Sequence, residues 1–156
     1  APNSGVKFSC VRYGNVIGSR GSVIPLFEEQ AKSGVLTITD ERMTRFWISL
    51  EQGVKFVLRS LEDMKGGEIF VPRMKSMPIT DLAEIIAPEC KLKVIGMRPG
   101  EKIHEILITE EEARHTIQEH DRFIILKGKG NLPEGFTYTS NNAEEISANE
   151  LIISNG

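Results

Sequence analysis

The sequence predicts an α/β or α+β domain, and three observations lead to this prediction. Short apolar runs typical of strands alternate along the chain with amphipathic stretches typical of helices. The composition is that of an ordinary globular protein, with 40% hydrophobic and 26% charged residues over 156 positions. A chain of this length buries roughly 70% of the surface of its unfolded state, which is enough to form a core.

The same composition excludes several classes of protein. It does not fit a disordered chain, a collagen or a disulfide scaffold. No apolar run approaches the roughly 20 residues that span a bilayer, so we expect neither a membrane span nor a secretory signal. The net charge of −3 argues against a general nucleic-acid binder. Cys10 and Cys90 lie far apart in sequence, which favours two free thiols and a cytoplasmic location.

The first elements surround a glycine-rich turn. Residues 6–11 alternate apolar and polar side chains and predict a strand, and the apolar pair at its end favours burial on both sides. Residues 12–22 contain three glycines and predict a turn. A helix over residues 22–33 is expected to begin at a Ser22 cap and to end at Gly34.

The middle of the chain holds the clearest helix. Residues 34–39 predict a short extended segment, and residues 40–48 a charged loop that ends in aromatic residues. Residues 49–62 predict a helix because their apolar side chains recur with helical spacing. This apolar stripe consists of Leu50, Val54, Val57, Leu58 and Leu61. Residues 68–72 predict a buried strand ended by a proline.

The last part of the chain carries shorter elements. We expect, in order, a helix over 81–87 capped by Thr80, a strand over 92–96, a turn over 98–101, a short helix over 102–107, an acidic helix over 110–115 capped by Thr109, a strand over 122–127 and a terminal helix with a capping box of Ser147 and Glu150.

Two segments could bind an anion or a nucleotide through arginine or backbone amides. Backbone N–H groups of residues 14–22 precede a helix and suit a phosphate, although a plain strand-to-helix turn explains them as well. Arg42 and Arg45 could hold a phosphate through their planar guanidinium groups. The alternative is a solvated charged loop with Phe46 and Trp47 in the core.

A third candidate is the turn over residues 98–101. Its proline and glycine would hold Arg98 and Glu101 on one side of the turn. A guanidinium group suits a pyrophosphate, and a carboxylate suits a ribose diol because it accepts two hydroxyl hydrogens. A local ion pair at the start of the helix expected over 102–107 is the alternative.

Several familiar motifs are incomplete in this sequence. Residues 128–130 resemble the start of a dinucleotide fingerprint, but Pro133 stands where the third glycine belongs. Neither Tyr13 nor Tyr138 has a lysine four residues later, so no Tyr-x-x-x-Lys pair is present. The three histidines do not have metal-ligand spacing. We therefore assign neither catalytic residues nor metal ligands.

Residues 11–25, VRYGNVIGSRGSVIP, closely resemble one stretch of the extended short-chain dehydrogenase/reductases. More narrowly, they resemble the inverting UDP-N-acetylglucosamine 4,6-dehydratases, which open the pseudaminic acid pathway and are related to capsule and polysaccharide-biosynthesis dehydratases. Three further motifs agree in order: ITD with MTRFW, GGEIFVP, and RPGEK. The resemblance covers residues 6–116 strongly and the tail weakly.

The resemblance implies the C-terminal part of such an enzyme. In that family the NADP fingerprint and the Tyr-x-x-x-Lys pair precede the Arg-Tyr-Gly-Asn segment. The implied fold is therefore α/β, with the last strands of the Rossmann sheet and the small substrate-binding α/β domain. Residues 1–127 would form the sugar-nucleotide-binding domain with terminal Rossmann strands, and residues 128–156 a C-terminal tail with a short helix.

Family roles follow the matching positions. Asn15 resembles the asparagine that contacts the sugar beside the nicotinamide, and Thr39 resembles a residue that lines the uracil pocket. Arg45 and Arg98 resemble the arginines on the diphosphate and uridine side. Glu101 resembles the acid that holds the ribose hydroxyls. Val23 resembles a residue at the boundary between cofactor and substrate. The resemblance thus implies five substrate-binding residues and one cofactor contact.

The function that the resemblance implies is UDP-sugar recognition. The family is a group of NADP-dependent lyases, but we expect this chain alone to lack activity and not to bind NADP by itself. Its expected partners are a UDP-sugar and either an N-terminal half or a second copy. The alternatives are a non-catalytic UDP-sugar-binding module and half of a related capsule-sugar dehydratase or C5-epimerase.

Overall fold

The structure is a computed structural model that describes residues 5–19 and 22–155. The chain forms two compact units that alternate along the sequence. The first unit takes residues 1–13, 51–73 and 106–138, and the second takes residues 14–50, 74–105 and 139–156. Residues 128–156 are thus divided between the units. The domain division expected at residue 127 stays a prediction.

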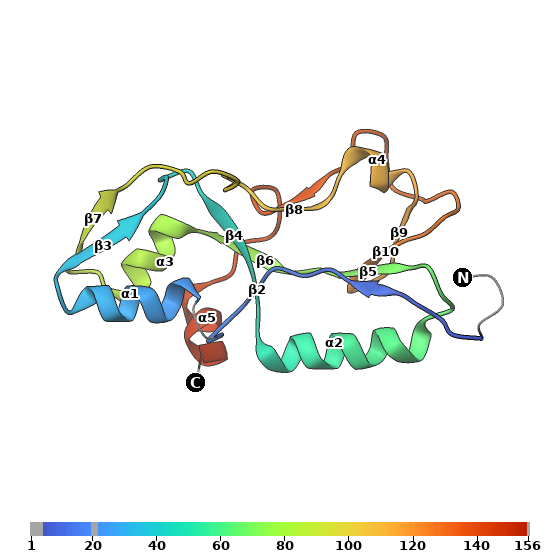
Figure 1. The fold of residues 1–156 in the computed structure, drawn as a ribbon, viewed down its shortest axis with the longest axis horizontal. Coiled ribbons are helices and arrows are strands. Elements are labelled where there is room, and N and C mark those ends of the chain that lie inside the picture. The colour runs from blue at the N-terminus through green and yellow to red at the C-terminus, as the bar shows by residue number, and fades with distance from the viewer. Residues whose placement is uncertain (1–4, 20–21, 156) are drawn as a thin grey trace. The chain divides into compact units, whose positions relative to one another are not determined.

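The first unit contains a four-stranded sheet in the order β1-β5-β10-β9 (Figure 1). Its strands are β1 (Cys10–Val11), β5 (Ile69–Pro72), β9 (Thr116–Gln118) and β10 (Arg122–Ile125). β1 runs parallel to β5, and β10 runs antiparallel to both of its neighbours. Helix α2 (Leu50–Asp63) packs on this sheet, because Phe56 clusters with Phe70 and Ile124. The strands expected over 68–72 and 122–127 are confirmed.

Helix α2 is confirmed, but its apolar stripe is exposed. The five stripe residues have exposed fractions between 40% and 66%, whereas Gly53, Phe56 and Ser60 are buried. The strand expected over 6–11 is also shorter than predicted, and Val6 and Phe8 are 60% and 71% exposed. Burial on both sides is therefore wrong for this strand. Among the described residues β1 pairs with β5 alone, so β1 is an edge strand of this sheet.

A buried carboxylate closes the turn before β5. Glu68 is 9% exposed and accepts hydrogen bonds from Ser9 Oγ at 2.6 Å, from Gly66 N at 2.8 Å and from Lys65 N at 3.0 Å. Burial alone would raise the pKa of Glu68, but these hydrogen bonds outweigh burial and lower its pKa to about 2. The ionised carboxylate therefore stabilises this turn.

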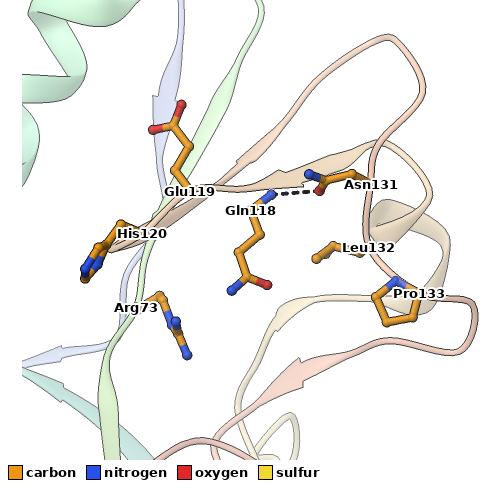
Figure 2. Close-up of a pocket in the computed structure, with 7 residues that line it drawn as sticks. All are labelled: Arg73, Gln118, Glu119, His120, Asn131, Leu132 and Pro133. Atoms are coloured by element: carbon orange, nitrogen blue, oxygen red, sulfur yellow. Dashed lines mark hydrogen bonds between the residues drawn. The ribbon is translucent and has the colours of Figure 1, made fainter.

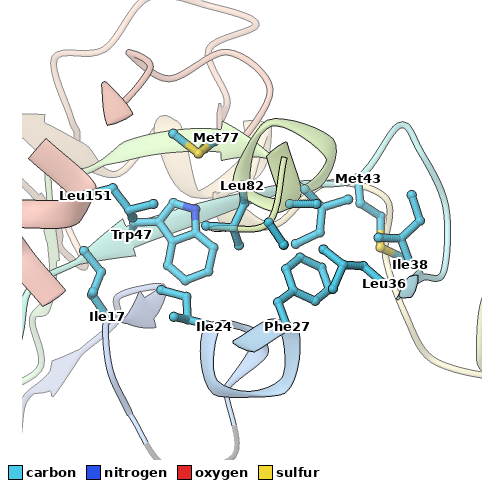
Figure 3. Close-up of a cluster of buried hydrophobic side chains, with 13 residues drawn as sticks. Ile17, Ile24, Phe27, Leu36, Ile38, Met43, Trp47, Met77, Leu82 and Leu151 are labelled. Carbon is cyan, nitrogen blue, oxygen red and sulfur yellow. The ribbon is translucent and has the colours of Figure 1, made fainter. Parts of the chain in front are cut away.

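The second unit combines a three-stranded sheet with a parallel pair of strands. The sheet has the order β2-β4-β6 and contains β2 (Asn15–Val16), β4 (Thr44–Ile48) and β6 (Lys75–Pro78). The pair is formed by β3 (Val35–Ile38) and β7 (Lys91–Val94). Helices α1 (Val23–Ala31), α3 (Ile79–Ile86) and α5 (Ala148–Asn155) belong to the same unit. Phe27 of α1, Trp47 of β4 and Leu82 of α3 meet in its core (Figure 3).

Two predictions for this part of the chain are wrong. Residues 44–48 form strand β4 rather than a loop, because β4 pairs with strands on both sides and buries its aromatic residues. No helix forms over residues 102–107. Instead the backbone there bonds to distant segments, with Thr44 N donating to Ile103 O and Ser140 N donating to Glu105 O. Residues 106–108 form β8 (Ile106–Ile108), which pairs with β11 (Tyr138–Thr139).

Helix ends follow local chemistry in most cases. Thr109 caps α4 (Glu110–Ala113) as expected, and it does so in a capping box with Glu112. Ser147 and Glu150 bond reciprocally at the start of α5. Gly34 has a φ of +75° just after α1, as its expected role requires. Two helix starts differ from expectation, because the Ser22 side chain makes no cap hydrogen bond and α3 begins directly after Pro78. No helix among the described residues is both long and apolar enough to cross a membrane.

Candidate functional site

A cavity of about 300 Å³ lies in the second unit. Its wall comes from β2, α1, β3 and the residue after it, β4, α3 and the loop over residues 95–101. All six residues singled out in the sequence line this cavity, namely Asn15, Val23, Thr39, Arg45, Arg98 and Glu101. Apolar side chains such as Leu26, Phe27 and Ile79 complete the wall. A mostly apolar cavity with a few convergent polar groups is typical of a small-molecule site.

Arg45 is held in place by the protein itself. Its Nη1 donates to the carbonyl oxygens of Thr44 and Ile103 at 2.7 and 3.0 Å. Its Nη2 donates to the carbonyl oxygen of Lys102 at 3.0 Å and to Met43 Sδ at 3.3 Å. A guanidinium group has five N–H donors, so these contacts leave Nε–H uncommitted. Arg45 therefore offers the cavity its positive charge and one donor, while it fixes the segment that follows residue 101.

The turn over residues 98–101 is closed by the carboxylate of Glu101. Arg98 N donates to Glu101 Oε2 at 2.8 Å, and Gly100 has a φ of +86°. The Arg98 residue is exposed, and Glu101 is half-buried. The backbone contact occupies one oxygen of the Glu101 carboxylate. Its other oxygen and the Arg98 guanidinium group are the polar groups that this turn can offer to a ligand.

Arg42 does not belong to the cavity. Its Nε and Nη2 donate to the two carboxylate oxygens of Asp40 at 2.9 and 2.7 Å. The side-chain hydrogen bond from Arg42 lowers the pKa of Asp40 to about 2. Arg42 and Asp40 thus form a local pair in which Arg42 is exposed and Asp40 is half-buried. Of the two arginines considered together in the sequence, Arg45 lines the cavity and Arg42 is committed elsewhere.

Asn15 lies on β2 and lines the cavity. In the pairing of β2 with β4 it is opposite Trp47. Its Nδ2 donates to Phe46 O at 3.1 Å and to the two carboxylate oxygens of Glu105 at 3.2 and 3.3 Å. Glu105 also accepts from Phe46 N at 2.8 Å. The sequence offered no signal for Glu105, because its contacts are to residues that lie far from it along the chain.

Two buried polar atoms of the wall lack a partner among the described residues. The indole Nε1 of Trp47 and the hydroxyl of Ser22 make no hydrogen bond there, and Trp47 is only 3% exposed. Buried donors without partners are uncommon, and they are expected where a ligand or a water completes the site. One of the two sequence interpretations of residues 40–48 places Trp47 in the core, which is correct, but the sequence carries no signal for its unpartnered indole N–H.

The glycine-rich segments owe two of their glycines to packing. A Cβ on Gly14 would lie 2.4 Å from Phe46 Cβ, so Gly14 lets β4 approach closely. A Cβ on Gly130 would lie 2.3 Å from Thr116 O. Close backbone approach within the protein therefore explains both positions without a bound phosphate. Arg20 and Gly21, which belong to the first glycine-rich turn, lie outside the described residues.

A second hollow of about 590 Å³ lies in the first unit (Figure 2). Its rim is formed by Arg73, Gln118, Glu119, His120, Asn131, Leu132 and Pro133. Most of these residues are exposed, and the hydrogen bond from Gln118 N to Asn131 Oδ1 ties the end of β9 to the segment that contains Asn131. None of the residues singled out in the sequence reaches it. The smaller cavity of the second unit is therefore the better candidate.

Comparisons with known proteins point in the same direction. A family model described as "Polysaccharide biosynthesis protein" matches residues 1–127. The inverting UDP-N-acetylglucosamine 4,6-dehydratase of Campylobacter jejuni is 46% identical over 162 residues, which cover 91% of this chain and 48% of that enzyme. The capsular polysaccharide biosynthesis protein CapD of Staphylococcus aureus is 39% identical over 136 residues, which cover 81% of this chain and 22% of that protein.

A solved structure agrees with these sequence relatives. The crystal structure of Pen from Bacillus thuringiensis superposes with a TM-score of 0.85 at 37% identity, and the match covers 96% of this chain and 49% of that one. The chain thus spans about half the length of both the Campylobacter enzyme and Pen.

Proposed function

Because this chain belongs to the polysaccharide biosynthesis protein family, we propose that it supplies the UDP-sugar-binding part of an inverting UDP-N-acetylglucosamine 4,6-dehydratase. Its fold is that of part of an extended short-chain dehydrogenase/reductase. The observation that carries the proposal is the cavity of the second unit. Six residues from five separate segments of the sequence line it, and each stands at a position that resembles a functional position of the family.

The lining residues suit the parts of a UDP-sugar. Arg98 and the charge of Arg45 favour the diphosphate, and the free oxygen of Glu101 can accept a hydrogen from a ribose hydroxyl. Thr39 would lie at the uracil end, whereas Asn15 would contact the sugar. Arginine is the side chain best suited to phosphate recognition because its charge persists at all physiological pH values.

The NADP of this family fits the chain poorly. Of the two glycines in residues 128–130, Gly130 is explained by packing against Thr116, and no complete fingerprint is present in the sequence. Val23 is the single residue to which we assign a contact with the cofactor. We therefore propose that NADP and the Tyr-x-x-x-Lys pair are supplied by polypeptide outside these residues. The chain alone would then bind substrate without converting it.

The exposed apolar face of helix α2 suits a polypeptide partner. We call the α2 stripe the five exposed residues Leu50, Val54, Val57, Leu58 and Leu61. The stripe presents apolar side chains, and β1 is an edge strand among the described residues, a kind of surface at which polypeptides often associate. We propose that the half of the enzyme not represented here packs against it. Self-association through the same surface is the alternative.

The cellular setting follows from the proposed reaction. The inverting activity of the Campylobacter relative supports a place in nucleotide-sugar synthesis that leads to pseudaminic acid. Cys10 and Cys90 are both free thiols, which fits the reducing conditions of the cytoplasm.

Calorimetric titration of this chain with UDP and with UDP-N-acetylglucosamine tests the proposal. We expect saturable binding of both ligands and weaker binding of ADP, whose larger base does not match a uracil site. A second assay mixes the chain with NADP⁺ and UDP-N-acetylglucosamine, and we expect no 4-keto product. Absence of heat at millimolar UDP would remove the binding proposal. Turnover by the chain alone would contradict the assignment of catalysis to other residues.

Two other functions have specific support. The similarity to CapD favours a capsule-sugar dehydratase or C5-epimerase. The lack of a Tyr-x-x-x-Lys pair favours a UDP-sugar-binding module without catalysis. Addition of the separately produced N-terminal half of the Campylobacter enzyme distinguishes them. An inverted 4-keto product supports the first proposal, a product with another stereochemistry supports the epimerase, and binding without restored activity supports the module.

A further inference from the structure

A chain of polar contacts behind the cavity holds the Asn15 side chain in one orientation. Glu105 does not line the cavity, yet its carboxylate accepts hydrogen bonds from Asn15 Nδ2 and from Phe46 N. Glu105 is fixed in turn by Ser140, whose Oγ accepts from Glu105 N at 2.9 Å and donates to Thr44 O at 3.0 Å. Ser140 is 1% exposed, so this support is buried.

The two ends of the Asn15 amide are distinguished by these neighbours. Both Phe46 O and the Glu105 carboxylate are acceptors, and only the amide NH₂ group can donate to them. A flipped amide would place Oδ1 against a carbonyl oxygen and a carboxylate. The NH₂ group is therefore committed to the protein, and Oδ1 is the polar atom that Asn15 can present to the cavity.

We infer that Glu105 is a positioning residue that makes Asn15 a hydrogen-bond acceptor, and that the ligand group at this point is a donor. This inference rests on the proposed UDP-sugar function and narrows it. A sugar hydroxyl or an N-acetyl N–H would be recognised at Asn15, whereas a carbonyl or phosphate oxygen would be rejected. A buried polar pair that fixes an acceptor in this way selects against ligands that lack the donor.

The test compares Glu105→Gln with the wild-type chain. The Gln amide has the shape of the carboxylate, but one of its two positions becomes a donor that faces the NH₂ group of Asn15. We expect the affinity for UDP-N-acetylglucosamine relative to UDP to fall about tenfold, as for loss of one oriented hydrogen bond. The affinity for UDP alone should stay within about twofold, because Glu105 acts on the sugar contact.

Two variants separate positioning from general destabilisation. Glu112→Gln is the matched control, because Glu112 is another half-buried carboxylate that accepts from a distant side chain, Arg12, but lies in the first unit. It should leave the ratio of affinities unchanged. In an Asn15→Ala background, Glu105→Gln should have no further effect on the ratio. An equal effect in both backgrounds would show that Glu105 does not act through Asn15.

A second measurement does not require a ligand. The side-chain NH₂ signals of Asn15, assigned by their loss in Asn15→Ala, should exchange with solvent at least about tenfold faster in Glu105→Gln than in the wild type. If Glu105→Gln does not fold, Asn15→Asp replaces it, because that variant removes the donor and keeps the side-chain shape. Fluorescence of Trp47, the single tryptophan, reports folding.

The outcomes are distinct. Fast exchange of the Asn15 NH₂ group in the wild type, or an unchanged affinity ratio in Glu105→Gln, overturns the positioning role while UDP binding stands. A wild-type chain that binds UDP and UDP-N-acetylglucosamine equally also overturns it. A chain that binds neither ligand overturns the proposed function, and the exchange measurement still decides whether Glu105 orients Asn15.

Discussion

Replacement of Arg45 by alanine should lower both the stability of the second unit and the affinity for UDP. The Arg45 side chain makes three hydrogen bonds to carbonyl oxygens of residues 44, 102 and 103, at 2.7 to 3.0 Å. Each intramolecular hydrogen bond contributes about 1 kcal/mol net to the free energy of unfolding. The three bonds together give a loss of about 3 kcal/mol in Arg45→Ala, because the carbonyl groups are left without this donor.

Arg98→Ala is the matched control for the loss of an arginine from the cavity wall. Arg98 is exposed, so its removal should change the free energy of unfolding by less than about 0.5 kcal/mol. Its effect on UDP binding should be a loss of about 1–3 kcal/mol, as for a hydrogen bond to a charged group. The two variants should therefore both weaken binding, but only Arg45→Ala should weaken the fold.

Urea unfolding followed by tryptophan fluorescence measures the difference. Trp47 is the single tryptophan, is 3% exposed and lies in the second unit, so its signal reports on the unit that contains Arg45. We expect the urea midpoint of Arg45→Ala to fall clearly below that of Arg98→Ala at an unchanged slope. Equal midpoints for the two variants would refute the assignment of Arg45 to the backbone of residues 102 and 103.

Three further predictions follow from packing, charge and exposure. Gly14→Ala should destabilise the second unit by about 2 kcal/mol in urea unfolding, because the new Cβ meets Phe46, whereas Gly53→Ala, whose Cβ has open space, should be neutral or stabilising. No difference between the two would contradict the close approach of β4. Lowering the pH should destabilise the first unit between about pH 4.5 and about pH 2, because Glu68 has a pKa near 2 when folded and 4.5 when unfolded, and its contribution is present above that range. Thermal unfolding of Glu68→Gln across this range should show a weaker pH dependence than the wild type, and identical profiles would count against it. Leu58→Ser should leave the thermal midpoint of the chain within about 2 °C but weaken pull-down of a complementing N-terminal half, and full retention of that partner would argue for another docking surface.

Local patterns predicted the elements whose stability is decided locally. The strand β5 follows two glycines and ends at a proline, and the capping box of Thr109 and Glu112 is visible in four consecutive residues. The prediction of a helix over residues 102–107 is wrong, although the apolar spacing there is helical. The backbone of this segment instead accepts hydrogen bonds from Thr44 N and Ser140 N. Such non-local bonds have no signature in a window of neighbouring residues.

The same division holds for the candidate site. Motif resemblance singled out the residues that line the cavity, because they stand in short recognisable runs. It could not identify Glu105 or the unpartnered indole N–H of Trp47. Their importance depends on which atoms of Asn15 and Phe46 lie opposite them, and this is decided by the register of β2 on β4. The sequence also could not show that the α2 stripe is exposed, since helical spacing predicts an apolar face but not what covers it.

The polypeptide passes from one unit to the other five times, at residues 13–14, 50–51, 73–74, 105–106 and 138–139. Neither unit can therefore be produced as one uninterrupted fragment of the chain. The many contacts between segments distant in sequence also favour slow folding. Attempts to minimise this protein to its ligand-binding unit would need a rearranged gene with new linkers rather than a simple truncation.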